Sequence, residues 1–255
     1  MKNNKVYIFL LILMLAFFFL MYFTIGKNHI EKSNQELTLL VGDNTIWNYS
    51  NLNWYKVSDT SIPQYNWKKF KIYLDGIYKD DYYVWHDDKW YIFDDNKQPI
   101  NYSEKFLGVV ANYNIKVKEF MPKEVEDSEV IYSFLSKKGI SSSTELTVKT
   151  QTTFDIDDDN NQEKIYIVSN AFAIDFYPDE VFSYVFMEKN KKLYEIYGFK
   201  EKNNYNNGTK PYINSILDVD DDGQYEIIVT LAQYSNLPQD NRLYKFTKDS
   251  FKQII

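Results

Sequence analysis

The sequence predicts a mainly β protein, built from short antiparallel strands and carried on one N-terminal membrane-spanning helix. Aromatic residues make up 18% of the 255 positions, and such side chains favour pleated, half-buried surfaces. Short aromatic and β-branched runs alternate with Gly, Asn and Asp turn signals along most of the chain. One uncharged run near the N-terminus predicts the membrane helix.

Composition excludes several kinds of partner and chemistry. The formal net charge is −7, so we expect no nucleic-acid partner, because phosphate binding needs a basic face. The chain has no cysteine, which excludes disulfides, thiolate catalysis, lipid attachment to an N-terminal Cys and Cys-ligated metal sites. The length beyond the N-terminal segment allows one large or two small domains.

Residues 6–25 carry no charged side chain. At about 1.5 Å per residue, such a helix spans about 30 Å, which is the thickness of a bilayer core. We expect an uncleaved signal anchor, because the residues after the apolar run offer no A-x-A-like cleavage site. Residues 1–5 would form a cytoplasmic tail and residues 26–36 a linker to an extracytoplasmic C-terminal domain of a single-pass cell-membrane protein. The alternative is cleavage, which would release a secreted protein.

Residues 37–118 are predicted to form an aromatic-rich β region. Strands are expected at 37–41, 52–57, 69–74, 82–86, 90–93 and 107–117. Its aromatic side chains are expected to fill a core rather than form a sugar-binding platform, because small β-domains use such residues inside. A hairpin turn at Asp87-Asp88 would place Trp85 opposite Trp90 on the neighbouring strand.

Residues 119–255 are predicted to hold one short α-helix and two strand-rich units. The helix is expected at 122–138, because acidic residues lie near its start and Lys137-Lys138-Gly139 closes it. Strands are expected at 146–154, 164–169, 181–188, 193–199, 212–217, 226–231, 242–246 and 251–254.

Two acidic loops in this part of the chain share one spacing and indicate metal binding. The acids at loop positions 1, 3, 5 and 9 are Asp218, Asp220, Asp222 and Glu226 in one copy, and Asp155, Asp157, Asp159 and Glu163 in the other. Calcium takes six to eight oxygen ligands at about 2.3–2.6 Å. Position 6 is Gly223 or Asn160, and these are the residues that best tolerate a positive φ.

Neither loop is an EF-hand, because position 12 is Tyr166 or Val229 instead of Glu, and each loop leads into a predicted strand. The pattern D-x-D-x-D-G-x-x-[DE] before an apolar strand resembles the calcium loop of the FG-GAP/VCBS repeat, the strand–loop–strand unit of integrin-type β-propellers. The resemblance covers about residues 145–255. It implies two propeller-blade-like repeats, too few to close a propeller of four or more blades. It also implies that the backbone carbonyls at position 7, Gln224 and Asn161, complete the calcium shells.

Calcium in these loops is expected to be structural. A cage with every ligand from one loop leaves little open coordination for a substrate, and magnesium prefers an octahedral shell that keeps several waters. Asp158 and Asp221, at position 4, are expected to face solvent. Extracellular calcium modules bind with dissociation constants of about 0.1–1 mM, which supports placing the domain outside the cell.

No catalytic motif is found, so an enzyme is not expected. His29 and His86 are not expected to meet. The acid pairs Asp80-Asp81 and Asp94-Asp95 do not form sites as pairs, because adjacent strand residues point to opposite faces. We expect a membrane-anchored extracytoplasmic binding or scaffold protein, with a cell-envelope polymer or a protein as ligand. The alternatives are a cell-envelope glycan hydrolase whose acid pairs are assembled by the fold, and a subunit of a secreted assembly with an edge strand covered on oligomerisation.

Overall fold

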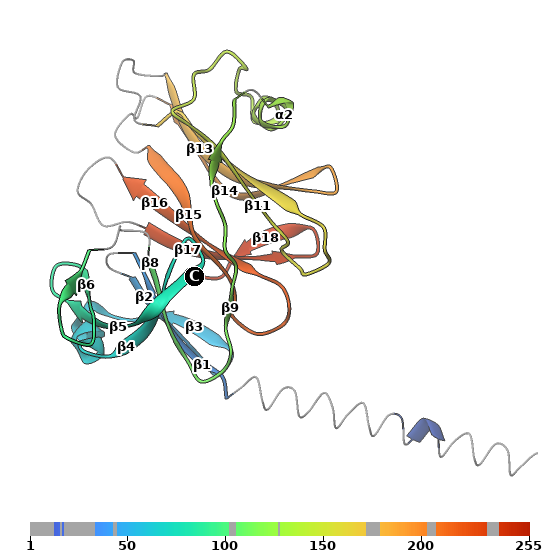
Figure 1. Ribbon diagram of the computed structural model, residues 1–255. Coiled ribbons are helices and arrows are strands. Elements are labelled where there is room, and N and C mark those ends of the chain that lie inside the picture. Colours follow the sequence, from blue (N-terminus) through green and yellow to red (C-terminus); the bar gives the residue numbers. More distant parts are fainter. Residues whose placement is uncertain are drawn as a thin grey trace, which may run out of the picture.

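The computed structural model describes residues 13–15, 17, 34–42, 45–101, 106–126, 128–171, 179–202, 208–233 and 240–255. The fold is mainly β, as predicted, and strands β1–β18 form three antiparallel sheets (Figure 1). The predicted tail, and most of the predicted membrane anchor and linker, lie outside the described residues. Within the described part of the chain, no helix is both long and apolar enough to span a bilayer.

The N-terminal part of the chain forms an eight-stranded sheet in the order β3-β2-β1-β8-β4-β5-β6-β7. Its elements are β1 (Glu36–Val41), β2 (Thr45–Ser50), β3 (Asn53–Lys56), β4 (Lys69–Leu74), β5 (Ile77–His86), β6 (Trp90–Phe93), β7 (Pro99–Ile100) and β8 (Phe106–Ala111). A 3₁₀ helix, η1 (Asp59–Tyr65), adds Ile62 and Tyr65 to the core on one face of this sheet. Leu39 and Leu40 alternate between the two faces, and both are fully buried.

Two five-stranded sheets follow. The outer sheet has the order β10-β11-β12-β13-β14 and the central sheet the order β18-β17-β16-β15-β9. Their strands are β9 (Lys116–Val117), β10 (Lys123–Glu124), β11 (Val148–Phe154), β12 (Glu163–Ser169), β13 (Glu180–Lys189), β14 (Lys192–Lys202), β15 (Thr209–Asp218), β16 (Glu226–Gln233), β17 (Asp240–Thr247) and β18 (Ser250–Gln253).

The three sheets are stacked in layers, with the central sheet between the other two (Figure 1). On one face, its Ile227 and Val229 share a core with Ile165 of the outer sheet. On the other face, its Ile228 packs with Leu107 of the eight-stranded sheet. Strand side chains alternate between the two faces, so the central sheet is covered on both sides, and the loops at its ends are anchored in a packed interior.

Helix α2 (Glu129–Lys137) covers the free face of the outer sheet (Figure 1). Ser128 is its N-cap, and the hydroxyl accepts a hydrogen bond from the backbone N–H of Ile131 at 3.5 Å. Phe134 stacks on Phe186 of β13 with ring centroids 3.9 Å apart and planes 7° apart. The helix therefore forms a fourth layer over the outer sheet.

Two predicted elements have wrong boundaries, and one strand was missed. The helix does not begin at residue 122, because Lys123–Glu124 pair with β11 as strand β10, and Ser128 caps the helix later. The single strand expected at 107–117 ends at Ala111, and the chain then crosses to the central sheet as β9. Strand β2 was not predicted, although it pairs along the whole length of β1.

The predicted pairing of Trp85 with Trp90 is also wrong. The β5–β6 register places Trp85 opposite Tyr91, and Trp90 opposite His86. The connection covers residues 87–89, one residue more than the expected two-residue turn. A shift of one residue moves every side chain to the other face. Trp90 is therefore buried, and Trp85 lies on the exposed face.

Candidate metal sites in two matching loops

Each acidic loop connects two neighbouring strands of one five-stranded sheet. The first loop joins β11 to β12 in the outer sheet, and the second joins β15 to β16 in the central sheet. The apolar run after each loop becomes a strand with buried side chains on both faces, such as Ile165 and Tyr166 in β12. Both ends of each loop are thus fixed by hydrogen-bonded, buried strands.

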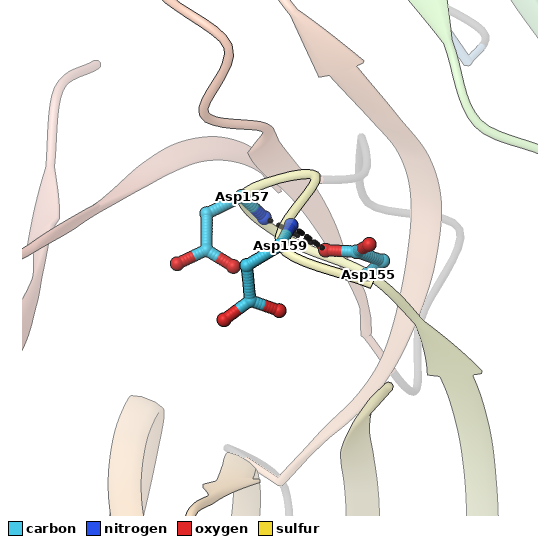
Figure 2. A group of neighbouring side chains, drawn as sticks. All are labelled: Asp155, Asp157 and Asp159. Atoms are coloured by element: carbon cyan, nitrogen blue, oxygen red, sulfur yellow. Dashed lines mark hydrogen bonds between the residues drawn. The ribbon is translucent and has the colours of Figure 1, made fainter. Parts of the chain in front are cut away.

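The carboxylate at position 1 organises the turn of each loop. Asp155 accepts hydrogen bonds from the backbone N–H groups of Asp159 at 3.1 Å and Asn160 at 2.8 Å. Asp218 accepts the same two bonds from positions 5 and 6 of its own loop, both at 3.1 Å. Figure 2 shows the Asp155 carboxylate with its bonds to the backbone nitrogens of Asp157 and Asp159. Such side-chain bonds to nearby N–H groups are typical of Asp in tight turns.

The glutamate at position 9 ties the end of each loop to its start. Oε2 of Glu163 accepts a hydrogen bond from the N–H of Ile156 at 3.0 Å, and Oε2 of Glu226 accepts one from Val219 at 2.9 Å. Both glutamates are buried, with 2% and 0% of their surface exposed. Each thus satisfies a backbone N–H at position 2, and its second oxygen contacts the ammonium group of a lysine, Lys189 or Lys245.

The backbone takes the same path through both loops. Position 4 has a φ of 51° at both Asp158 and Asp221, and position 6 has a φ of 67° at Asn160 and 82° at Gly223. Asn is among the few non-glycine residues that adopt this left-handed conformation readily. The replacement of Gly by Asn therefore leaves the path of the first loop unchanged.

The structure brings three of the four predicted carboxylates together in each loop. One oxygen from each member of the group lies within 4.8 Å of the others; the groups are Asp155, Asp157 and Asp159, and Asp218, Asp220 and Glu226. The remaining two predicted carboxylates, Glu163 and Asp222, contact the lysine that lies beside each group.

Lys189, the last residue of β13, places its ammonium group among the carboxylates of the first loop. Its Nζ lies 2.9 Å from Asp157 Oδ1, 2.7 Å from Glu163 Oε1 and 3.8 Å from Asp159 Oδ2. Its side chain is 12% exposed. These carboxylates stand at positions 3, 9 and 5 of the loop.

Lys245 of β17 makes the same set of contacts in the second loop. Its Nζ lies 2.9 Å from Asp220 Oδ2, 2.8 Å from Asp222 Oδ2 and 2.9 Å from Glu226 Oε1. The spacing of acids in the loop motif does not predict that a lysine contacts either loop. The strand register could have found them, because Lys245 stands directly opposite Glu226 across the β16–β17 ladder.

Burial and the lysine act in opposite directions on the second site. Burial raises the pKa of Glu226 to about 7, although the charge of Lys245 acts to lower it. Burial also raises the pKa of Asp218, against the N–H bonds that it accepts from Gly223 and Asp222. Burial acts to lower the pKa of Lys245, but its contacts with Glu226 and Asp222 outweigh burial and raise that pKa. Lys245 is therefore protonated at neutral pH.

The two loops contact each other. The backbone N–H of Tyr225, at position 8 of the second loop, donates to the carbonyl of Ile156 in the first loop at 2.9 Å. The Tyr225 hydroxyl donates to Asp158 at 3.3 Å, and Lys118 forms an ion pair with Asp158 at 2.6 Å. Asp158 and Asp221 are exposed, as expected, and Asp158 in addition contacts Lys118 and Tyr225 at the surface. Its ion pair with Lys118 lowers its pKa.

The position-7 residues hold the turn through their backbone N–H groups. Asn161 donates to Oδ1 of Asp159 at 2.7 Å, and Gln224 donates to Oδ1 of Asp222 at 2.9 Å. These bonds orient the position-5 carboxylate in each loop. Metal ligation by the two backbone carbonyls stays a prediction.

The acid pairs considered for catalysis contact other groups. Asp81 accepts a hydrogen bond from the Tyr78 hydroxyl at 2.8 Å, and Asp95 forms an ion pair with Lys69 at 2.6 Å. Three of the surface hollows among the described residues are each lined by a single carboxylate; these are Glu36, Asp81 and Glu119. His29 lies outside the described residues, and His86 packs edge-on against Trp90.

An exposed aromatic face lies on the outer side of β5 and β6. We define it by Trp67, Tyr83, Trp85, Tyr91 and Phe93. Trp67 is 41% exposed, and its ring centroid lies 5.4 Å from that of Trp85 and 5.2 Å from that of Phe93. The expectation that these residues fill the core is wrong, although Trp47 and Trp90 are buried as expected. The alternation along β5 and β6 explains the difference, because neighbouring residues face opposite sides.

Comparisons of this chain with protein-family models, with curated proteins and with solved structures found no match.

Proposed function

We propose that this chain is a membrane-anchored, extracytoplasmic binding or scaffold protein whose two acidic loops bind calcium in a structural role. The uncharged run at residues 6–25 supports the anchor. The observation that carries the calcium part is the repetition, in two separate loops, of the same contacts by positions 1, 5 and 9. Two unrelated acidic turns would not be expected to share these hydrogen bonds.

The arrangement of the strands supports two blade-like repeats. Strands β11–β14 and β15–β18 each run as four consecutive antiparallel strands, and the acidic loop joins the first two in both cases. A short extra strand, β10 or β9, pairs with the first strand of each unit. Four-stranded antiparallel sheets are the blades of β-propellers. The chain thus repeats a sheet as well as a loop.

The donor set of each loop fits a calcium ion. All side-chain donors are carboxylate oxygens, which are the hard ligands that calcium prefers. Oδ1 of Asp220 is buried and accepts no hydrogen bond from the residues that the structure describes. Oε1 of Glu226 is likewise without a well-directed hydrogen bond there, although the Lys245 ammonium lies 2.9 Å away. An ion bound at positions 1, 3, 5 and 9 would bring these carboxylate oxygens together and link the two strands that the loop connects.

Calcium is expected to stabilise the folded chain, and the two sites are expected to be separable by mutation. A calcium concentration of ten times Kd should stabilise the fold by about 1.4 kcal/mol per site, which corresponds to about 3–6 °C in Tm for a domain of this size. Asp220→Ala and Asp157→Ala should each remove one site. The measurements are calorimetric calcium titration and thermal unfolding of the full-length chain in mild detergent, with calcium or with chelator.

Asp249→Ala is the matched control, because Asp249 is an exposed acid in the turn before β18, outside both loops. This variant should keep both sites and the full response of Tm to calcium. If the wild-type Tm is the same in chelator and in 10 mM calcium, the loops are acidic turns and the calcium role is lost.

The exposed aromatic face supports the binding part of the proposal. Contiguous exposed apolar patches mark interaction surfaces, and the rings of Trp67, Trp85 and Phe93 lie side by side on this face. We expect Trp85→Ala to weaken retention of the chain on insoluble cell-envelope polysaccharide at least about five-fold, because a central aromatic contact contributes more than about 1 kcal/mol. Tyr55→Ala, an exposed aromatic residue on β3, is the control. Equal retention of both variants would remove this face as the ligand surface.

The alternative of a glycan hydrolase has less support. Glycoside hydrolysis uses two carboxyl groups about 5–9 Å apart across a cleft, whereas each hollow described above is lined by one acid. The binding role therefore accounts for the described surface better.

A further inference from the structure

Lys189 and Lys245 come from equivalent places in the two repeats. Each belongs to the strand that follows the position-9 glutamate in its sheet. Lys245 is the cross-strand partner of Glu226, and the pairing of Lys164 with Glu188 puts Lys189 at the matching position beside Glu163. The two lysines therefore occupy equivalent positions in the two repeats, as the acids of the two loops do.

Each ammonium group contacts carboxylates at positions 3 and 9. Among the described residues, no other positively charged group lies as close to these carboxylates. The Nζ atoms lie 2.7–3.0 Å from oxygens at positions 3 and 9. The lysine side chains are 12% and 18% exposed. A charged group in such a site is costly unless it is paired and hydrogen-bonded, and three carboxylates without a cation would repel one another. Lysine and acids thus stabilise each other.

The geometry points to Lys189 and Lys245 as resident counter-ions of the two loops. We propose that they hold the loops in the folded form without metal, and that a divalent cation enters a loop only by displacing the ammonium group. This inference rests on the proposed calcium role for its second half, because displacement requires that a cation binds. Its first half concerns the metal-free protein and stands on the ion pairs alone.

Lysine and calcium cannot hold these oxygens together. Calcium bonds oxygen at about 2.3–2.6 Å, and the ammonium groups already lie at hydrogen-bond distance from the position-3 and position-9 oxygens. Two cations sharing these oxygens would also repel each other strongly at a separation of a few ångströms. The lysine side chain can leave, because its charge sits on a flexible four-carbon stem. Calcium affinity should therefore be lower than the acids alone would give.

The test replaces the lysines in the full-length chain with Met, which keeps the length of the side chain and removes the charge. Lys245→Met and Lys189→Met should each lower Tm in chelator by about 5 °C, as expected for breaking a mostly buried ion pair in a domain of this size. Calcium should restore the lost Tm. In calorimetry, the Kd for calcium at the altered loop should fall at least about ten-fold.

Lys210→Met is the control, because Lys210 is exposed and lies near the start of β15, at the other end of this strand from the acidic loop. It removes the same charge but should change neither Tm in chelator nor the Kd for calcium. An unchanged Tm of both loop-lysine variants in chelator would overturn the counter-ion role. An unchanged Kd in variants that do bind calcium would overturn the displacement.

The failure of the proposed calcium role would look different. In that case no variant binds calcium at 10 mM, while Lys245→Met and Lys189→Met still lower Tm in chelator. The displacement would then be lost together with the calcium role. The counter-ion role would stand, with lysine as the permanent cation of both loops.

Discussion

Glu226→Ala is expected to lower the free energy of unfolding by about 3 kcal/mol and Tm by about 6–12 °C. Glu226 is fully buried and accepts a hydrogen bond from the backbone N–H of Val219, which is itself buried. Removing this carboxylate leaves that N–H without an acceptor, and an unsatisfied buried donor costs about 1–3 kcal/mol. It also removes one of the carboxylates around Lys245, although Asp220 and Asp222 still contact its ammonium group.

Glu226→Gln is the informative control for this prediction. Its amide oxygen can still accept the hydrogen bond from Val219, so only the charge is lost. We expect it to retain about half of the stability that Glu226→Ala loses, by chemical denaturation in chelator. Glu163→Ala should give a comparable loss, because Glu163 makes the corresponding bond to Ile156. A fully stable Glu226→Ala variant would contradict the contacts assigned to position 9.

Gly76→Ala is expected to destabilise the chain by about 3–5 kcal/mol, with a fall in Tm of about 10 °C. Gly76 lies in the turn between β4 and β5 with a φ of +79°, and a Cβ there would lie 1.8 Å from the carbonyl oxygen of Lys118. The same turn accepts a hydrogen bond from Phe120 through the carbonyl of Asp75, at 3.1 Å. A backbone atom cannot give way as a side chain would, so the turn and residues 118–120 must separate.

Gly223→Ala separates the two causes of this loss. Gly223 has a similar φ of +82°, but a Cβ there meets nothing within 4 Å. We therefore expect only the cost of the left-handed backbone, about 1–2 kcal/mol. Thermal unfolding of the two variants side by side measures the difference. Equal losses would mean that the β4–β5 turn does not rest on the segment around Lys118.

The Gly76 variant also bears on the loops, because residues 118–120 connect two parts of the molecule. Lys118 forms an ion pair with Asp158 and lies over the ring of Tyr225, with its Nζ 4.5 Å from the ring centroid. Displacing this segment should loosen the contact between the two loops. Any calcium response that depends on that contact would then weaken without a change in a loop residue.

The loops could be predicted from the sequence because their structure is local. Asp155 and Asp218 bond to N–H groups only four and five residues away, and a preference for positive φ at position 6 can be read from the residue type. Spacing alone therefore identified the acids that the structure brings together. The strands that flank both loops were also predicted, since apolar runs after the loops mark them.

The lysines and the layers could not be predicted in this way. Lys245 reaches the second loop through the β16–β17 register, which depends on the length of the intervening connection. Whether Trp85 is exposed likewise depends on one additional residue in the β5–β6 connection, which sets the register. The start of α2 was misplaced because Lys123–Glu124 pair with a strand that is distant in sequence. The strand and helix propensities of a local sequence do not predict pairings between segments that are distant in the chain.

The order of the layers also has a consequence for biosynthesis. The central sheet consists mainly of β15–β18, which follow all strands of the other two sheets in the chain and therefore leave the ribosome after them. Until those residues emerge, the eight-stranded sheet and the outer sheet each expose the apolar face that the central sheet later covers. The nascent chain must therefore be protected from aggregation until β15–β18 have emerged and covered these two faces.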